Sequence, residues 1–336
     1  MDLKVKRYNP KDGLPKELIG LVREKYGHQE NFDYFLNDFV KAFSFCVKNK
    51  NICFVPIAIY SGDKVKAHGA IIKDYRTELN EAFLGFFECL DDYTVFNSLW
   101  EELKVLAKEM GVSLIKGPVN GSIWHQYRAI RQTDGSPFFK SEMMCESYYY
   151  DLFLSKNPQV EIKYHSGYRE NFSAIINAGR LSYEKFIGAG FSIQEIEIID
   201  KNILGVVVDI SRKVFSNSWG LTDLSDDEFL DLYSGEKIKS NLNKLYLLQL
   251  KDKIIGFSII LKENDSTIIF KTIAVLPEYL GLGLGNALAY KVHLDAERDG
   301  VKRIIYALVN EDNNVKNFPK DDAVIFRKYS SFEFLI

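Results

Sequence analysis

Cysteine and proline are scarce in this chain, and neither sign of charge is in clear excess. Among 336 residues there are 4 cysteines and 8 prolines, and the net charge is −3. The cysteines form no C-x-x-C pair, which argues against a zinc site and a disulfide framework. A nearly neutral chain has no broad basic field for nucleic acid. No run approaches 18 apolar residues and no signal-type stretch opens the chain, so we expect a cytoplasmic protein that binds neither membranes nor nucleic acid.

Histidine is also scarce, and apolar residues are plentiful. The 5 histidines include no close pair at metal-ligand spacing, so we expect no metal site. Apolar residues make up 46% of the chain and aromatic residues 14%. In a chain of this length, that composition is sufficient for two packed cores.

An internal repeat organises the chain. At an offset of 189, an Asp-Lys dipeptide at 63–64 falls on another at 252–253. At the same offset, Ala107–Val112 falls on Ala296–Val301, and each segment ends a helical pattern with a glycine before a new apolar stretch. We therefore interpret the chain as a duplicated fold.

Both halves show the same order of predicted elements: a short strand, two helices, a hairpin, a third strand, a long helix and a buried strand. The first half has Leu3–Arg7, Lys16–Tyr26, Tyr34–Lys48, Cys53–Tyr60 with Val65–Asp74, Ala82–Cys89, Tyr93–Met110 and Val112–Lys116. The second has Ser192–Ile198, Ile203–Phe215, Ser225–Tyr233, Lys244–Leu250 with Lys253–Lys262, Thr267–Val275, Gly283–Asp299 and Arg303–Val309. Strands before and after one helix form a parallel pair, so we predict an α/β (α+β) fold with mixed twisted sheets. We place the domains at 1–154 and 191–336, with a packed connector at 155–190.

The most informative segment follows the strand predicted at 267–275. Pro277 ends that strand, and glycines at 281, 283 and 285 lead into the next helix. Glycine lets the backbone approach a ligand closely, and the free N–H groups of a helix N-terminus attract anions. The segment therefore predicts a diphosphate site that uses backbone donors. It is not a Walker A loop, which needs Lys-Ser or Lys-Thr, nor a G-x-G-x-x-G fingerprint, because Asn286 and Leu288 stand where a third glycine would be.

The segment V-L-P-E-Y-L-G-L-G-L-G-N-A-L at 275–288 resembles the acetyl-CoA signature of the GNAT superfamily of N-acetyltransferases. That signature is [Q/R]-x-x-G-x-[G/A] after a V-x-P strand end. Gly283 and Gly285 match it, whereas Leu280 replaces the first Gln or Arg. The element order of residues 192–309 is that of the family, and N-S-W-G at 217–220 resembles a tandem-domain subgroup. The resemblance implies two tandem GNAT-like domains, with acetyl-CoA or another acyl-CoA as co-substrate of the second.

The resemblance also implies site residues. For acyl-CoA binding it implies the strand end and the loop, namely Ile273, Val275, Leu280, Gly281, Leu282, Gly283, Leu284, Gly285 and Asn286, together with Asn313 near the pantetheine arm. Many members use a carboxylate of that strand as base, but residues 267–275 contain none, so Glu311 is the candidate base. Members often protonate the leaving thiolate with a tyrosine, for which Tyr329 is the nearest candidate and Tyr306 a weaker one.

The first half lacks the glycine loop. At the offset of 189, residues 277–285 correspond to residues 88–96, which hold no glycine and three carboxylates, Glu88, Asp91 and Asp92. Negative charge at a helix N-terminus repels a phosphate ligand. We therefore expect the first domain, with its degenerate loop, not to bind acyl-CoA.

The predicted function is transfer of an acetyl or other acyl group from CoA to a small-molecule or peptide amine, by direct attack at the second domain. Two alternatives remain open. One is a non-catalytic module that binds CoA or another ligand, which Leu280 and the missing strand carboxylate favour. The other is an aminoacyl transferase resembling those that build peptidoglycan cross-bridges, although the long charged coiled-coil insertion of those proteins is not visible in the sequence.

Overall fold

The chain forms two compact units. The computed structural model describes residues 2–196, 200–234, 242–312 and 322–336. Unit 1 consists of Met1–Tyr164, Gly220–Thr222 and Arg327–Ile336, and unit 2 consists of His165–Trp219 and Asp223–Phe326. The division falls inside β9 (Val160–Arg169) and β15 (Val324–Leu335), so each of these strands has residues in both units. The domain boundaries expected from the sequence follow the repeat rather than contacts, and they stay a prediction.

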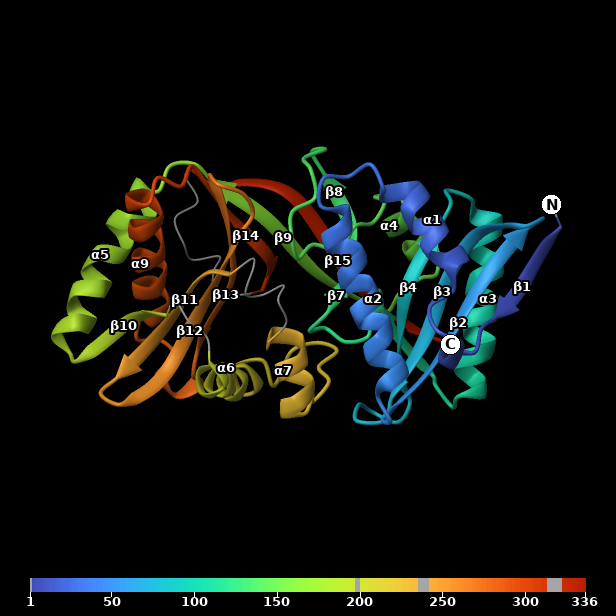
Figure 1. The fold of residues 1–336 in the computed structure, drawn as a ribbon, viewed down its shortest axis with the longest axis horizontal. Helices are drawn as coiled ribbons and strands as arrows, with labels where there is room; N and C mark the ends of the chain where they lie inside the picture. The colour runs from blue at the N-terminus through green and yellow to red at the C-terminus, as the bar shows by residue number, and fades with distance from the viewer. Residues whose placement is uncertain (1, 197–199, 235–241, 313–321) are drawn as a thin grey trace. The chain divides into compact units, whose positions relative to one another are not determined.

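Unit 1 contains a mixed sheet in the order β1-β2-β3-β4-β5, followed by the last residues of β15 (Figure 1). The strands are β1 (Leu3–Arg7), β2 (Ile52–Ser61), β3 (Lys64–Asp74), β4 (Glu81–Cys89) and β5 (Leu114–Gly117). The first four are antiparallel neighbours, whereas β4 and β5 are parallel. The helix α3 (Tyr93–Glu109) joins this parallel pair, as a crossover connection requires.

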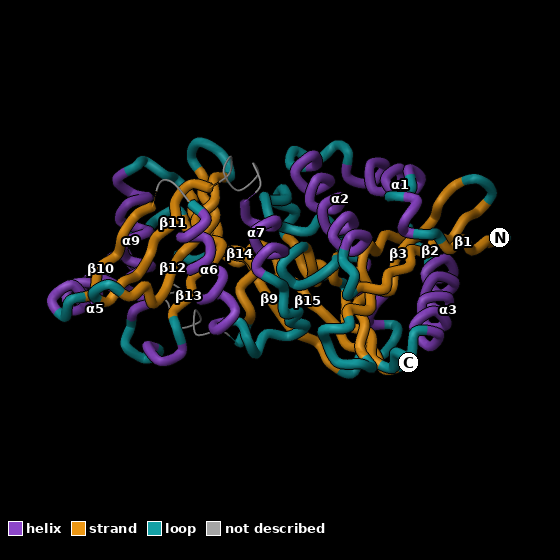
Figure 2. The backbone as a smooth tube through the Cα atoms, turned by 60° about the horizontal axis from the view of Figure 1, so that its bottom comes forward, coloured by secondary structure: helices purple, strands orange, loops and turns teal. Residues whose placement is uncertain are grey.

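Helices cover both faces of the unit 1 sheet. The ring of His68 on β3 lies against Phe39 of α2 (Phe32–Lys48), whereas Gly69, the next residue, lies near Leu99 of α3. Since successive strand residues point to opposite faces, α2 and α3 cover opposite sides, as Figure 2 also shows. The remaining elements of unit 1 are η1 (Pro10–Asp12), α1 (Lys16–Tyr26), α2 (Phe32–Lys48), β6 (Val119–Asn120), β7 (Gln126–Tyr127), β8 (Ala129–Thr133) and α4 (Tyr149–Leu154).

Unit 2 repeats this arrangement with the sheet order β9-β14-β13-β12-β11-β10. Its further strands are β10 (Phe191–Ile196), β11 (Leu242–Leu250), β12 (Lys253–Lys262), β13 (Thr267–Val275) and β14 (Arg303–Asn310). Strands β10 to β13 are antiparallel neighbours, and β13 and β14 are parallel. The α/β fold class with mixed sheets is therefore confirmed.

The helices of unit 2 include a close pair. They are α5 (Ser173–Gly188), α6 (Lys201–Val214), α7 (Asp226–Ser234) and α9 (Leu284–Arg298), with the 3-10 turn η2 (Pro277–Tyr279). Figure 1 shows α5 and α9 side by side, and a Cβ at Gly179 of α5 would lie 2.7 Å from Cβ of Tyr290 of α9. A capping box begins α7, because Ser225 N–H donates to Glu228 Oε2 (2.6 Å) and Glu228 N–H donates to Ser225 Oγ (3.3 Å).

The duplication is confirmed in the strand pairing. The hairpins close at Ser61↔Lys64 and at Leu250↔Lys253, which are related by the predicted offset of 189. The third strands deviate from it, because Cys89 pairs with Ala67 whereas Val275 pairs with Gly256. Cys89 thus corresponds to Val275, and Glu88 lies on a strand rather than in the loop, so the correspondence of Glu88 with Pro277 was wrong.

Among the described helices, none is long and apolar enough to cross a membrane.

Candidate functional site

The loop between β13 and α9 ends in a glycine that caps the helix. Gly281 and Gly283 both have a left-handed backbone, with φ of 80° and 78°. Gly283 is the N-cap residue of α9, and no side chain caps the helix there. Only glycine adopts this conformation without a steric penalty from Cβ, which explains why glycine stands at both positions.

The first turn of α9 presents backbone donors. The first N–H groups that bond back to Gly283 O belong to Asn286 and Ala287, at 3.0 and 3.2 Å. The N–H groups of Leu284 and Gly285 precede them, and no described residue accepts from either. No acidic residue lies in this turn to oppose the helix dipole. Open N–H groups at a helix N-terminus can hold an anion without a basic side chain. We call the segment 280–286 the diphosphate loop, after the site predicted there from the sequence.

Gly285 is not required by the folded chain itself. It is the second residue of α9, and among the described residues a Cβ there would meet only Ile273 Cδ1, at 3.8 Å, which is an ordinary contact. Packing of the described chain therefore does not require a glycine at this position.

The strands β13 and β14 separate beside the diphosphate loop. Their parallel pairing ends at Phe270 and Tyr306, although each strand continues for several residues. Lys271 forms a bulge at this point, because the pairing with β12 steps from Phe270 to Thr272. A bulge bends its strand and locally increases its twist. We call the resulting opening between β13 and β14 the wedge.

Two predicted residues present their backbone to the wedge. The N–H of Leu276 donates to Ile255 O on β12, at 2.9 Å. Because hydrogen-bonding direction alternates along an antiparallel strand, the N–H groups of Ile273 and Val275 point to the opposite edge. That edge is the one from which β14 has separated. The wedge and the diphosphate loop therefore bring together the predicted positions Ile273, Val275 and 280–286 in one part of unit 2.

The side chains of the diphosphate loop contribute little polarity. Leu280 and Leu282 are 61% and 51% exposed, whereas Leu284 is buried. Asn286 lies exposed in the first turn of α9. Any anion held here would therefore be bound mainly by peptide N–H groups.

Unit 1 closes the corresponding helix end with a carboxylate. Asp92 is the N-cap residue of α3, and its Oδ1 accepts from Thr94 N–H at 2.7 Å and from Val95 N–H at 3.2 Å. Only Leu90, Asp91 and Asp92 separate β4 from α3. Thr94 is the second residue of α3, as Gly285 is of α9, so in unit 1 the counterpart of the open Gly285 N–H is satisfied by a carboxylate whose charge also repels a phosphate. This supports the expectation that unit 1 binds no acyl-CoA.

Replacing Asp92 with alanine is expected to lower stability by about 1 kcal/mol, the usual effect of losing an N-cap side chain. The adjacent, exposed Asp91→Ala is the matched control and should leave stability unchanged. Urea denaturation of the three proteins measures the effect. An Asp92→Ala midpoint equal to that of wild type would contradict the capping role.

The wedge of unit 1 is also filled by its own chain, which the sequence analysis missed. The pairing of β4 with β5 ends at Phe83, and Phe86 has φ of 51° at a bulge. Phe86 N–H donates to Asn120 Oδ1 (2.6 Å), and Phe86 O accepts from His68 Nδ1 (2.6 Å). The sequence did contain one indication of this contact, because Asn120 is a polar residue in the short segment after β5. Its partner, the N–H of Phe86, could not be predicted from residue spacing.

Glu88 belongs to a buried polar cluster in unit 1. Its Oε2 accepts from Tyr149 OH at 2.5 Å and from Tyr26 OH at 3.1 Å, and lies 3.7 Å from Lys25 Nζ. Lys25 Nζ in turn donates to Cys89 O at 2.8 Å. Burial raises the pKa of Glu88 to about 7, although Lys25 opposes this shift. Glu88 therefore changes its charge near neutral pH.

A raised carboxyl pKa in the folded state makes stability depend on pH. The contribution of Glu88 is fully present below its ordinary pKa of 4.5 and is lost as the pH rises through about 7. We expect Glu88→Gln, which keeps an acceptor for Tyr149, to remove this decline between pH 4.5 and 7. Urea midpoints measured across that range test it, and parallel pH profiles for the two proteins would contradict the prediction.

The predicted catalytic residues belong to different units of the chain. Tyr329 belongs to unit 1, where it is buried and its hydroxyl donates to Glu142 Oε1 at 2.5 Å. Glu311 belongs to unit 2 and is half-buried in the turn after β14. Asn313 lies outside the described residues. The roles of these three residues stay predictions.

Tyr306 stands at the narrow end of the wedge. Its hydroxyl lies 2.6 Å from His293 Nε2, and His293 Nδ1 lies 2.6 Å from Ala289 O. A carbonyl only accepts, so Nδ1 carries the proton and Nε2 accepts from Tyr306. Burial lowers the pKa of His293 to about 4, which keeps this acceptor neutral at pH 7.

Among the described residues, no group of three or more His, Cys, Asp or Glu side chains could hold a metal ion.

Comparisons with known proteins agree with this geometry. The model of the acetyltransferase (GNAT) family matches residues 207–317. No curated protein matches the sequence.

Several solved structures have a similar fold along the whole chain. A tandem GNAT protein from the clavulanic acid biosynthesis pathway has a TM-score of 0.61 at 9% identity and covers 99% of this chain and 98% of its own. A conserved protein of unknown function from Enterococcus faecalis V583 has a TM-score of 0.61 at 11% identity, over 100% of this chain and 72% of its own. A GCN5-related N-acetyltransferase from Sphaerobacter thermophilus has a TM-score of 0.52 at 9% identity, over 99% and 95%. At such identities the likeness is one of fold.

Proposed function

We propose that unit 2 is a GNAT acyltransferase domain that binds acyl-CoA and transfers its acyl group to an amine. The match of the acetyltransferase (GNAT) family model to residues 207–317 and the fold shared with a tandem GNAT protein support the proposal. The observation that carries the proposal is the open N-terminus of α9 beside the wedge. There the N–H groups of Leu284 and Gly285 have no described acceptor, and Gly283 caps the helix without a side chain. In unit 1, by contrast, Asp92 caps the corresponding helix and Asn120 accepts from the N–H of Phe86 at the bulge of β4.

The residues of unit 2 fit a coenzyme A ester. The diphosphate loop would hold the diphosphate with peptide N–H groups and the positive end of the helix dipole. The N–H groups of Ile273 and Val275 would bind the pantetheine arm and the thioester carbonyl in the wedge. When bound, acyl-CoA supplies a carbonyl that is activated for attack by its thiolate leaving group.

Acyl transfer by direct attack requires proton movements at nitrogen and at sulfur. The ammonium group must first lose a proton to become a nucleophilic amine. Its nitrogen then forms a bond to the acyl carbon while the carbon–sulfur bond breaks, the nitrogen releases a second proton, and the thiolate gains one. Because β13 has no carboxylate, we propose Glu311 as the group that accepts the amine proton. Tyr329 remains the proposed donor to the thiolate, with Tyr306 as the second candidate.

Steady-state release of CoA thiol from acetyl-CoA, measured with a panel of small amines and peptides, tests the proposal. We expect turnover with at least one acceptor and loss of turnover in Gly283→Glu. Tight binding of CoA with no turnover on any acceptor would contradict the transferase proposal.

A non-catalytic CoA-binding module is the second candidate function. It is favoured by the side chains of β13, where Lys271 and Thr272 are the only polar groups near the wedge. The two candidates share the same CoA site, so they differ only in the turnover measurement.

A further inference from the structure

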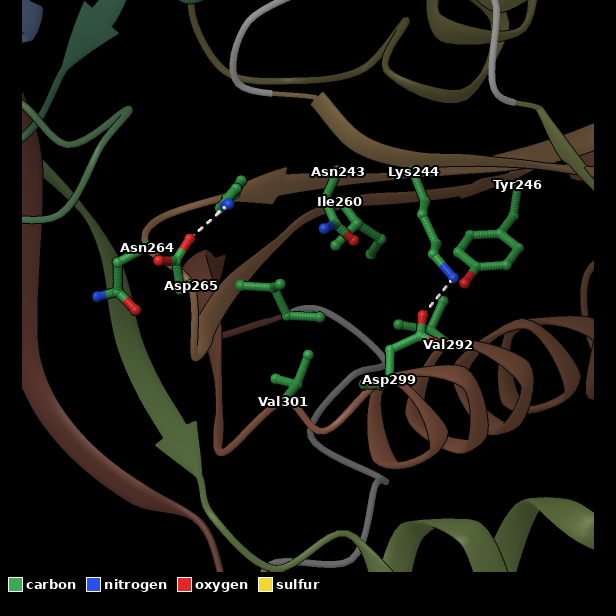
Figure 3. Close-up of a pocket in the computed structure, with 12 residues that line it drawn as sticks. Asn243, Lys244, Tyr246, Ile260, Asn264, Asp265, Val292, Asp299 and Val301 are labelled. Atoms are coloured by element: carbon green, nitrogen blue, oxygen red, sulfur yellow. Dashed lines mark hydrogen bonds and ion pairs between the residues drawn. The ribbon is translucent and has the colours of Figure 1, made fainter.

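A small cavity lies in unit 2 near the C-terminal end of α9. Its volume is about 130 Å³, and it is lined by residues of β11, β12, β13, the turn after β12 and the end of α9 (Figure 3). The helix has 15 residues and, at 1.5 Å per residue, is about 22 Å long. The cavity is therefore separate from the diphosphate loop, which lies at the other end of the same helix.

The floor of the cavity is aliphatic. Its apolar lining residues come from two strands, from α9 and from the segment after it, and they are Ile260, Ile268, Val292, Ala296 and Val301. The first four are each less than 5% exposed. A ligand that fills this space would bury apolar surface, which stabilises binding by roughly 25 cal/mol per Å².

The rim of the cavity carries two ion pairs. Lys244 Nζ lies 2.6 Å from Asp299 Oδ2, and Lys262 Nζ lies 2.7 Å from Asp265 Oδ1. Figure 3 shows Asp265 and Asp299 on opposite sides of the space, with Val301 between them. The hydrogen bond from Lys244 lowers the pKa of Asp299, so this carboxyl is ionised at neutral pH. The four charged lining residues sum to zero, with both signs present on each side.

This combination of floor and rim selects the charge type of a ligand. A ligand with a single charge would be attracted by one member of a pair and repelled by the other. A zwitterion can place its ammonium group against a carboxylate and its carboxylate group against a lysine. Exchange of partners costs little at Lys262 and Asp265, because an exposed pair of this kind contributes only about 0–1 kcal/mol.

The volume of the cavity selects the size of a ligand. An engineered apolar cavity of about 150 Å³ in another protein accommodates benzene, which has six non-hydrogen atoms. A half-open cavity of about 130 Å³ therefore suits a body of comparable size, with its polar groups at the rim. Aliphatic side chains on the floor favour a branched aliphatic body over an aromatic or polar one.

We propose that this cavity binds a small aliphatic α-amino acid, such as valine, in its zwitterionic form. The aliphatic side chain packs on Ile260, Ile268 and Val292, and the ammonium and carboxylate groups pair with the charged rim. The site does not depend on the proposed acyl transfer, because neither the diphosphate loop nor the wedge contributes to it.

Calorimetric titration of the full chain with L-valine, isobutylamine and isobutyrate tests the charge requirement. The three probes share a branched aliphatic body and differ only in their charged groups. We expect valine to bind with one site per chain and at least about tenfold more tightly than either singly charged probe, which corresponds to about 1.4 kcal/mol. Absence of valine binding, or equal affinity for all three probes, would overturn the proposal.

Two variants locate the binding. Ala296→Leu fills the cavity and keeps the ion pairs, so it should abolish valine binding, while circular dichroism and urea denaturation show that the chain remains folded. Lys262→Gln removes one exposed cation from the rim and should weaken valine binding at least about fivefold. The matched control is Lys253→Gln, which removes an ion-paired lysine from the other end of β12 and should have no effect. Unchanged valine affinity in both Ala296→Leu and Lys262→Gln would place the binding elsewhere and refute the assignment.

Discussion

Replacing Gly285 with valine is expected to weaken CoA binding at least about tenfold, or about 1.4 kcal/mol, with little change in stability. The signature that the loop resembles has glycine or alanine at this position, so a side chain larger than a methyl group is needed for the test. Among the described residues, a Cβ here would have one neighbour within 4 Å, Ile273 Cδ1 at 3.8 Å. The branched side chain occupies space that the diphosphate needs, so affinity should fall while stability changes little.

The matched control is Gly205→Val in α6, where a Cβ would meet no described atom within 4 Å. This substitution should leave CoA affinity unchanged. Calorimetric titration of the two variants provides the comparison, and urea denaturation shows that both are folded. If Gly285→Val bound CoA as tightly as Gly205→Val does, the close approach of the diphosphate to Gly285 would be refuted.

Loss of the buried charge pair in unit 1 should have the largest effect on stability. Arg327 and Glu142 are 2% and 0% exposed at the side chain, and Arg327 Nη1 lies 2.5 Å from Glu142 Oε2. Arg327→Met leaves the carboxylate buried without its cation, which costs about 3–5 kcal/mol. Urea denaturation measures the decrease.

A double variant separates the charge pair from simple packing. In Arg327→Met/Glu142→Gln no uncompensated charge is buried, and the introduced amide still offers an acceptor to Tyr329 OH. We expect the double variant to regain at least about 1 kcal/mol relative to Arg327→Met alone. Additive destabilisation by the two substitutions would show that the side chains act independently.

Tyr329 illustrates why a role cannot be assigned from chain position alone. The sequence places it in the tail, where the family resemblance suggests a proton donor. The structure gives its hydroxyl a buried partner, Glu142, that is 187 residues earlier in the chain. A contact between residues so far apart in the chain cannot be predicted from the spacing of neighbouring residues. Tyr329→Phe distinguishes the two roles, since a structural hydroxyl changes stability and a proton donor changes the pH profile of turnover.

The diphosphate loop was predictable because its signals are local. Alternating glycines after a proline-terminated strand specify both the left-handed backbone at Gly281 and Gly283 and the absence of a capping side chain. The offset of 189 likewise holds where corresponding turns of the two halves have the same length, as at the two hairpins. It fails at the third strand because the connections on either side of that strand differ in length between the two halves.

Of the two side chains that satisfy backbone N–H groups in unit 1, Asp92 and Asn120, only the role of Asp92 could be predicted from the sequence. Asp92 could be assigned as a negative group at a helix start, and it does cap α3. The contact of Asn120 with Phe86 N–H depends on where a bulge forms in β4, and bulges follow from sheet twist and pairing rather than from a residue pattern.

The number of CoA molecules bound per chain tests the central claim most directly. Calorimetric titration of wild type should give one site, because only unit 2 leaves the N-terminus of its crossover helix open. Gly283→Glu, which adds a side chain and a negative charge at that N-cap, should abolish the site. A stoichiometry of two, or CoA affinity in Gly283→Glu equal to that of wild type, would contradict the account.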